Sequence, residues 1–446
     1  MRLNSISAAL VFALALPCAA AAELYTLRQC ADYAASNSPE IREIALNEKN
    51  YLGGAAEARA ARWPKFTLVT YAGPAYKVTG DADNYRKDYG VWGPYYHAKL
   101  EAQMPLWTWG KIDGYIAAAE SGARAAAAEA AQKRGEVIYE VKKYYNSLLL
   151  ARRLKRTVDD VIATLAEAIK KADELYQAGE GEVKKSDLEM LKVYMAEAQK
   201  NQREAAKGIT LARLALMQKM GMEESPDFDI AAVKLAPQEG ELQPLEHYVS
   251  TAFENRPEWR MLKSGLDARR QLLSAEKADR YPLIFLAGEA AYNNSPVRDD
   301  QRNPWLYDPY NGTSGGIVVG AKFDFAPAAL TARLASKQAD LDKLKEKEKF
   351  ARSGIALQVR NAWETVTAAR ADIDSAKAGL DAAQRWVMAA GLVYALGTAG
   401  AEDALKGLAA KAKTEKDYYQ AIFDYNMALA DLARMCGVET PATEQE

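Results

Sequence analysis

The chain repeats itself after about half of its length. The motif at 38–41 (SPEI) returns at 256–259 (RPEW), and the motif at 176–179 (YQAG) returns at 394–397 (YALG), both at an offset of 218 residues. A third pair of motifs, RWP and RYP, has the same offset. A period of this size predicts two copies of one structural unit, in place of the three domains that 446 residues would otherwise suggest.

Each copy contains a helix of unusual length with a heptad pattern. In the second copy the large seam residues are Val359, Val366, Ile373, Leu380, Val387 and Tyr394, and an alanine lies three residues after each of the first five. The first copy keeps the phase, with Lys155 as its one break. No proline lies between Lys111 and Gln177, so this helix would be about 100 Å long. Sustained heptads predict coiled-coil packing in a rod or tube; an ordinary solvated hairpin is the alternative.

Glycines mark the ends of these helices. The first helix reaches a tip at Gly179, Glu180 and Gly181, and the second reaches one at Gly397 and Thr398. Glycine supplies the positive φ at which helices end, and acids such as Asp187 and Asp403 suit the first turn of the following helix. Each copy is therefore predicted to carry a helical hairpin with a tight glycine tip.

Between its helices, each copy has two apolar patches of about ten residues, the length of a tilted membrane-spanning strand. Residues 95–104 and 317–325 alternate strictly between apolar and polar positions, and 66–76 and 283–292 do so less strictly. An apolar face and a polar face are what a water-filled barrel needs. Aromatic residues, which favour membrane interfaces, crowd the loops that we expect beside these strands: Tyr85, Tyr89, Trp92, Trp305, Tyr307 and Tyr310.

Four strands are too few for a barrel made by one chain. Transmembrane barrels begin at about eight strands, and an open sheet edge cannot lie in lipid. If these strands cross a membrane, several chains must share one barrel. Two small β-hairpins on a soluble protein are the alternative.

The N-terminus has the layout of a secretory signal peptide. A basic start precedes an apolar run at 8–16 that is too short for a membrane helix, and small residues end at Ala22, where we expect cleavage. Lipidation of Cys18 is an alternative, which Pro17 disfavours because the residue before a lipidated cysteine should be small.

The expected units are a signal peptide (1–22), a first repeat (23–221), a proline-containing linker (222–245), a second repeat (246–437) and a tail (438–446).

Composition excludes several classes of protein. The chain has 58 Lys and Arg against 60 Asp and Glu, a net charge of -2, without the basic footprint of a nucleic-acid binder. Two histidines and three cysteines leave little material for a metal site, a cofactor site or an enzyme. Cys30 and Cys436 could pair as a disulfide in an exported protein, or be two small buried apolar residues.

Taken in order, these features resemble the TolC-like outer-membrane efflux protein family, the outer membrane factors. The resemblance covers residues 23–437, and its most telling pieces are 37–40 (NSPE), 61–64 (ARWP), 104–107 (MPLW) and 394–398 (YALGT). It implies a mainly α fold with a β-barrel portion. Long coiled-coil hairpins would form a periplasmic tube, and four transmembrane strands per chain would complete a 12-stranded barrel in a homotrimer.

The resemblance also implies a function. The chain would be the outer-membrane exit duct of a tripartite efflux pump, conducting small molecules passively and without a cofactor. Its partners would be a periplasmic adaptor, an inner-membrane transporter and outer-membrane lipid, and not nucleic acid. The alternatives are a duct for type I protein secretion and a soluble periplasmic coiled-coil adaptor. An adaptor has no need of the apolar face formed by Ile317, Val319 and Phe323.

The family places its pore constriction just after the second tip. Asp403 matches the family aspartate, with Glu402 beside it, and three copies would attract cations to a narrow pore. A helix-start acid that only stabilises the helix dipole is the alternative. Lys406 stands where the family has a second acid, which weakens any acidic ring.

Gating contacts in the family join the two tips. Ser186, Asp187 and Tyr394 match the family's polar and tyrosine positions, whereas Ala399 stands where the gating arginine should be. The closed state must therefore be held differently here, or more weakly. The tip residues that would contact an adaptor are Gly179, Glu180, Gly181, Gly397 and Thr398.

Overall fold

The computed structural model describes residues 24–81, 84–178, 184–232, 234–301, 303, 305, 307–395 and 401–438, with only the backbone described at 393–395 and 401. The expected signal peptide, both tip turns and all of the tail except Val438 lie outside the described residues. Among the helices that the structure describes, none is long and apolar enough to span a membrane.

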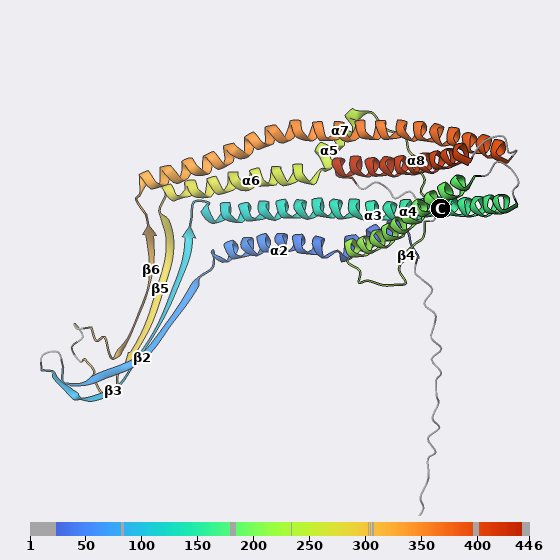
Figure 1. Cartoon of the computed structure of the whole chain (residues 1–446). Coiled ribbons are helices and arrows are strands. Elements are labelled where there is room, and N and C mark those ends of the chain that lie inside the picture. Colours follow the sequence, from blue (N-terminus) through green and yellow to red (C-terminus); the bar gives the residue numbers. More distant parts are fainter. Residues whose placement is uncertain are drawn as a thin grey trace, which may run out of the picture.

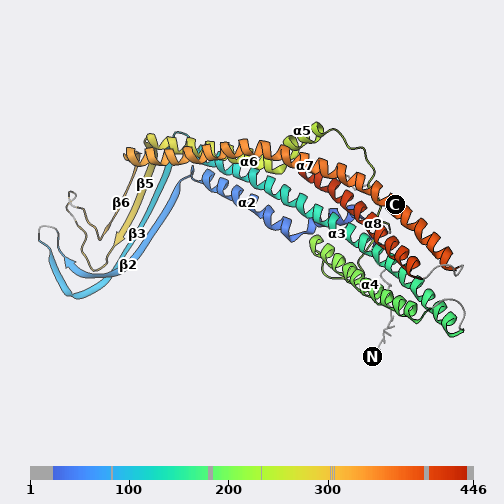
Figure 2. The same ribbon diagram turned by 45° about the horizontal axis from the view of Figure 1, so that its top comes forward.

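Most of the molecule is a bundle of long helices. Four of them run side by side from the sheet to the middle of the molecule (Figure 1): α2 (Pro39–Ala60), α3 (Lys111–Ala178), α6 (Pro257–Lys277) and α7 (Pro327–Ala395). Beyond the middle, α3 forms an antiparallel hairpin with α4 (Lys185–Met220), and α7 forms one with α8 (Ala401–Cys436) (Figure 2). The 68 residues of α3 and 69 of α7 confirm the two long helices predicted from the sequence.

The large residues of the predicted heptad seams are buried or half-buried wherever the structure describes their side chains, with one exception. Val359, Val366, Leu380 and their companion alanines pack in the interior of the α7–α8 half, as Val141, Leu148 and Leu165 do along α3. This burial confirms coiled-coil packing. Tyr176, which the pattern placed in the seam, is 46% exposed, because it lies in the last turn of α3, beyond the apolar cluster that joins α3 to α4.

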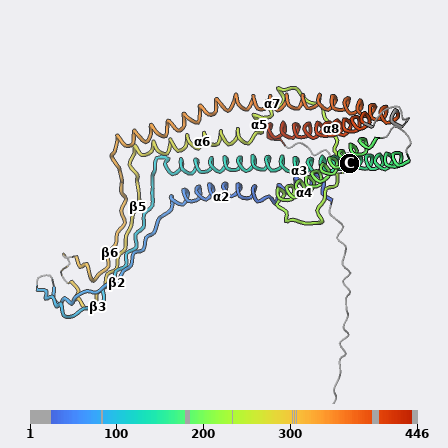
Figure 3. The backbone as a smooth tube through the Cα atoms, viewed as in Figure 1, coloured from blue at the N-terminus to red at the C-terminus, as the bar shows by residue number. Residues whose placement is uncertain are grey.

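One antiparallel sheet extends from the end of the helices. Its strands, in spatial order, are β2 (Lys65–Thr79), β3 (Arg86–Trp107), β5 (Leu283–Asn294) and β6 (Gly312–Lys322). The backbone trace places the β2–β3 turn and the β5–β6 connection together at the end of the sheet farthest from the helices (Figure 3). All four predicted strands are therefore present in one sheet.

Two details of the strand prediction are wrong. Tyr89 and Trp92, which we expected in a loop, lie within β3, because this strand pairs with β2 almost to the hairpin turn. Phe323 and Phe325 lie after β6, where the chain leads into Pro327 at the start of α7. Alternating apolar and polar residues indicate an extended backbone, whether or not it pairs with a neighbouring strand. The pattern therefore overestimated the length of β6 at its C-terminal end.

Shorter elements complete the middle of the molecule. They are the helices α1 (Leu27–Asn37) and α5 (Leu245–Asn255), the 3-10 turn η1 (Ala278–Arg280), and the two-residue strands β1 (Leu24–Tyr25) and β4 (Asp229–Ile230). β1 and β4 pair in parallel, so the linker between the repeats returns to the start of the first repeat.

The two cysteines belong to different cores. Cys30 packs with Leu216 and Met220 in the first half, and Cys436 packs with Val359 and Leu432 in the second. Both thiols are free and buried, so the possible disulfide is wrong and the interpretation as two small buried residues holds. Burial raises the pKa of Cys30 to about 12 and that of Cys436 to about 11.

The same helix joint occurs in both halves. α4 ends at Gly221 with φ of 72°, and α8 is followed by Gly437 with φ of 69°. A Cβ on Gly221 would lie 2.7 Å from the carbonyl oxygen of Asn37, and one on Gly437 would lie 2.7 Å from that of Asn255. Each long hairpin therefore returns to the junction of two short helices, α1–α2 or α5–α6, through a position that only glycine fits.

We expect Gly221→Ala to destabilise the protein by about 1–3 kcal/mol, because a left-handed backbone and a steric clash are imposed together. The measurement is the apparent Tm of the purified protein in detergent, followed by circular dichroism. Gly135→Ala is the matched control, since this α3 glycine has nothing within 4 Å among the described residues, and alanine favours a helix. Equal Tm values for the two variants would contradict the steric role of Gly221.

Candidate functional site

The second tip presents two acids and one base at the start of α8. Glu402 and Asp403 lie in the first turn of this helix and are exposed. Lys406 donates to the carboxylate of Glu402 at 2.7 Å. This hydrogen bond holds the pKa of Glu402 below its usual value and raises that of Lys406, which Asp403 raises further. Lys406 is thus engaged with Glu402, while the carboxylate of Asp403 remains exposed at the start of the helix.

At the first tip, Asp187 caps its own helix. Its carboxylate accepts a hydrogen bond from the backbone N–H of Lys184 at 3.1 Å, which satisfies one of the free amides at the start of α4. Ser186 beside it is exposed. The backbone of Tyr394 lies near the end of α7; its side chain, together with Gly179, Glu180, Gly181, Gly397 and Thr398, lies outside the described residues.

One turn beyond the second tip, α8 packs into the first hairpin. Leu405 is buried in an apolar cluster with Leu165, Ala172, Leu188 and Leu191. The two hairpins are therefore held together close to their tips by apolar side chains from three helices.

An ion pair that sequence reasoning missed joins the hairpins farther from the tips. The guanidinium of Arg153 on α3 donates to the carboxylate of Glu415 on α8. It also lies 4.6 Å from the centre of the Tyr419 ring. Glu415 is only 8% exposed, so this charge depends on its partner. Arg153 stands in an ordinary basic stretch, 262 residues from Glu415, and no local pattern marks the pair.

A cavity of about 590 Å³, lined by residues of α3, α4 and α8, lies next to this contact. Its walls are mainly apolar and include Leu154, Val158, Tyr194 and Leu408. The second hairpin thus contacts the first at the Leu405 cluster and at the Arg153–Glu415 pair, with the cavity beside them, and Ile422 of α8 extends the contact into the core around Leu148.

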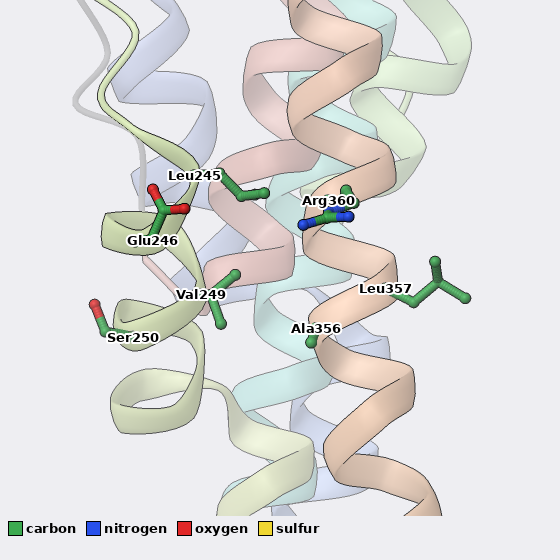
Figure 4. A pocket seen from close by; sticks show the side chains of 7 residues that line it. All are labelled: Leu245, Glu246, Val249, Ser250, Ala356, Leu357 and Arg360. Carbon is green, nitrogen blue, oxygen red and sulfur yellow. The ribbon is translucent and has the colours of Figure 1, made fainter.

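A second hollow, of about 540 Å³, lies between α5 and α7 (Figure 4). Its lining residues are Leu245, Glu246, Val249, Ser250, Ala356, Leu357 and Arg360. The hydroxyl of Ser250 donates to the backbone oxygen of His247 at 2.9 Å, a bond within its own helix. Across the residues that the structure describes, no group of three or more His, Cys, Asp or Glu side chains could hold a metal ion.

The sheet has two faces of opposite character. Cross-strand partners share a face, so the register places Tyr71, His97 and Asn293 together, followed by Lys99. Lys99 forms ion pairs with Glu101 at 2.8 Å and Glu289 at 2.9 Å on this polar face. The opposite face carries exposed apolar side chains, namely Leu68, Tyr96, Leu100, Tyr292, Ile317 and Val319.

These features agree with a known protein family. The family model for outer membrane efflux proteins matches the chain twice, at residues 31–222 and 248–438. The chain therefore belongs to the outer membrane efflux protein family, as the sequence resemblance indicated. It is therefore an outer-membrane protein of efflux transport. No curated protein sequence matches the chain significantly.

Solved structures show the same fold at low sequence identity. A membrane protein from Pseudomonas aeruginosa has a TM-score of 0.76 at 18% identity, over 92% of this chain and 93% of that one. The outer membrane protein VceC from Vibrio cholerae has a TM-score of 0.73 at 18% identity, over 93% and 96%. The open state of the MtrE outer membrane channel from Neisseria gonorrhoeae has a TM-score of 0.74 at 18% identity, over 92% and 89%.

We expect Arg153→Met to destabilise the protein by on the order of 3 kcal/mol, because it leaves the buried carboxylate of Glu415 without its partner. Adding Glu415→Met should recover much of this loss, since no unpaired charge then remains. Denaturant unfolding in detergent measures both variants. The control is Arg270→Met, which breaks an exposed pair with Asp267 and should cost below about 1 kcal/mol. A double variant less stable than Arg153→Met alone would contradict this role.

Proposed function

We propose that three copies of this chain form a passive duct through the outer membrane. The observation that carries the proposal is the four-stranded sheet, in which the edge strands β2 and β6 each pair on one side only among the described strands. Unpaired edge groups cannot lie in lipid. Pairing β6 of one copy with β2 of the next would close 12 strands and leave no edge. The exposed apolar face, where Ile317 is 79% exposed, would then contact lipid.

The helical part supports the same arrangement. α2 and α7 are the first and last helices of the row beside the sheet (Figure 1). Both present large exposed apolar side chains, including Leu46 and Leu52 on α2 and Phe350 and Leu357 on α7. A threefold rotation that joins β6 to β2 brings α7 of one copy beside α2 of the next. These side chains would then be covered, and the helices would enclose a periplasmic tube.

The duct acts without chemistry of its own in this proposal. A periplasmic adaptor would contact the tips, and an inner-membrane transporter would deliver small molecules for export as part of a tripartite pump. Residues 1–22 would be removed as a signal peptide. The units 23–221 and 246–437 would be the two repeats, joined by 222–245 and followed by the tail 438–446; the doubled order of elements and the two family matches support this division.

The proposed constriction lies at the second tip. Each copy contributes Glu402, Asp403 and Lys406, a net charge of -1, and Glu402 and Lys406 form an ion pair. Three copies of Asp403 would then be the carboxylates that face cations in the pore. Without the family arginine, the closed state would be held by the Leu405 cluster and the Arg153–Glu415 pair.

Planar-bilayer recording of the purified protein tests the duct and its constriction together. We expect discrete channels from a trimer, and a reduced preference for cations in Asp403→Asn because three negative charges leave the narrowest region. Asp417→Asn is the matched control, since it removes an exposed acid from the same helix four turns away.

Each outcome has a separate meaning. Unchanged selectivity in Asp403→Asn would return Asp403 to the role of a helix-start acid. A monomer found in the soluble periplasmic fraction would overturn the duct and favour the adaptor alternative, in which the strands do not meet lipid.

A further inference from the structure

The connection between β5 and β6 folds back across the sheet. We use the name β5–β6 connection for its described parts, 295–301 and 307–311 together with 303 and 305. The backbone N–H of Asp299 donates to the oxygen of Val78 at 3.0 Å, and the N–H of Val78 donates to the oxygen of Val297 at 3.3 Å. Val78 belongs to β2, which is separated from β5 by β3. The connection must therefore cross over β3 to reach it.

The crossing takes place on the polar face of the sheet. A Cβ on Gly93 would lie 2.2 Å from Val297 Cγ1, so Val297 rests directly on this glycine of β3. The hydroxyl of Tyr95 donates to the backbone oxygen of Pro309 at 3.1 Å. Gly93 and Tyr95 share a face with His97, because side chains two residues apart in a strand point the same way. The connection thus covers the face that carries His97 and Lys99.

Burial of the sheet at this end agrees with the crossing. Ala75 pairs with Gly93 in the register, and Asn293 pairs with His97. Both residues are only 5% exposed, although they lie near the tip of a thin sheet. Tyr96 and Tyr292, their neighbours on the opposite face, are exposed.

Specific contacts hold the connection in place. The guanidinium of Arg298 lies 3.5 Å from the centre of the Tyr310 ring and 4.8 Å from that of Tyr76. The side chain of Asn311 donates to the oxygen of Arg298 at 2.9 Å and accepts from the backbone N–H of Ser295 at 2.6 Å. The connection is therefore an ordered part of the sheet end, with Arg298 as a positioning residue.

We propose that the β5–β6 connection narrows the outer mouth of the channel and sets the size of the molecules that can leave. The inference rests on the proposed trimeric duct, in which the polar face of the sheet lines the pore. A connection that crosses this face then projects into the pore, and three copies reduce its opening. The exit would thus have a size limit at the end opposite to the Asp403 constriction.

The test compares single-channel conductance in planar bilayers and the exclusion of polyethylene glycols of graded size, added on the outer side. We expect Arg298→Ala/Asn311→Ala to release the connection, to raise conductance by on the order of two-fold and to admit larger polymers, because pore diameter governs both readouts. The control is Tyr96→Ala, on the opposite face of the same strand, which should leave both unchanged.

A second variant covers the case in which the released protein does not fold. Asp300 is exposed within the connection, so Asp300→Cys can be modified with a bulky thiol reagent while the buried Cys30 and Cys436 do not react. We expect modification to reduce conductance by narrowing the mouth. Channels whose conductance and polymer cut-off do not respond to either change would overturn the constriction and leave the duct intact. A wild-type protein that forms no channel would instead overturn the proposed duct.

Discussion

The open edges of the sheet are the constraint on which the remaining structure depends. Each edge strand carries a row of backbone N–H and C=O groups that must be paired once water is removed. Apart from the hydrogen bonds between Val78 and the β5–β6 connection, the four described strands of one chain pair only at their inner edges. In the proposed trimer, neighbouring copies pair the outer edges. The long helices then share this requirement, because they continue from the ends of the same strands and carry apolar residues on the outermost helices of the row.

Periodic features of the fold could be predicted from the sequence. The heptads of α3 and α7 specify which side chains are buried over many turns, and the structure buries Val141, Leu148, Val359 and Val366 accordingly. The alternation of apolar and polar residues identified the two faces of the sheet for a similar reason. A pattern repeated over many residues remains recognisable when a single residue deviates from it. The exceptions occur at ends: Tyr176 lies outside the seam, and Phe323 and Phe325 lie outside the strand.

Contacts between distant segments could not be predicted in this way. Arg153 and Glu415 come from different repeats, and each resembles many other charged residues on these helices. The β5–β6 connection likewise has aromatic residues that were assigned to a membrane interface, whereas Tyr310 packs against Arg298 and Tyr95. The three-dimensional fold determines which residue a single side chain contacts, and no pattern in one sequence predicts that residue. The tip acids are an intermediate case, because the sequence predicted the first-turn position of Asp403, whereas the role that we propose for it in the pore came only from the family resemblance.

The crossing of the β5–β6 connection has a consequence for how the protein assembles. Because it connects the second β-hairpin to β2 of the first, the four strands of one chain form a single preformed sheet. In the proposed trimer only three pairs of strands between subunits would then have to align during insertion, each between an 11-residue strand and a 15-residue strand. An error in alignment would then displace four strands at once. The barrel of such a trimer would therefore close cooperatively, in one step, and would not close gradually by adding one hairpin at a time.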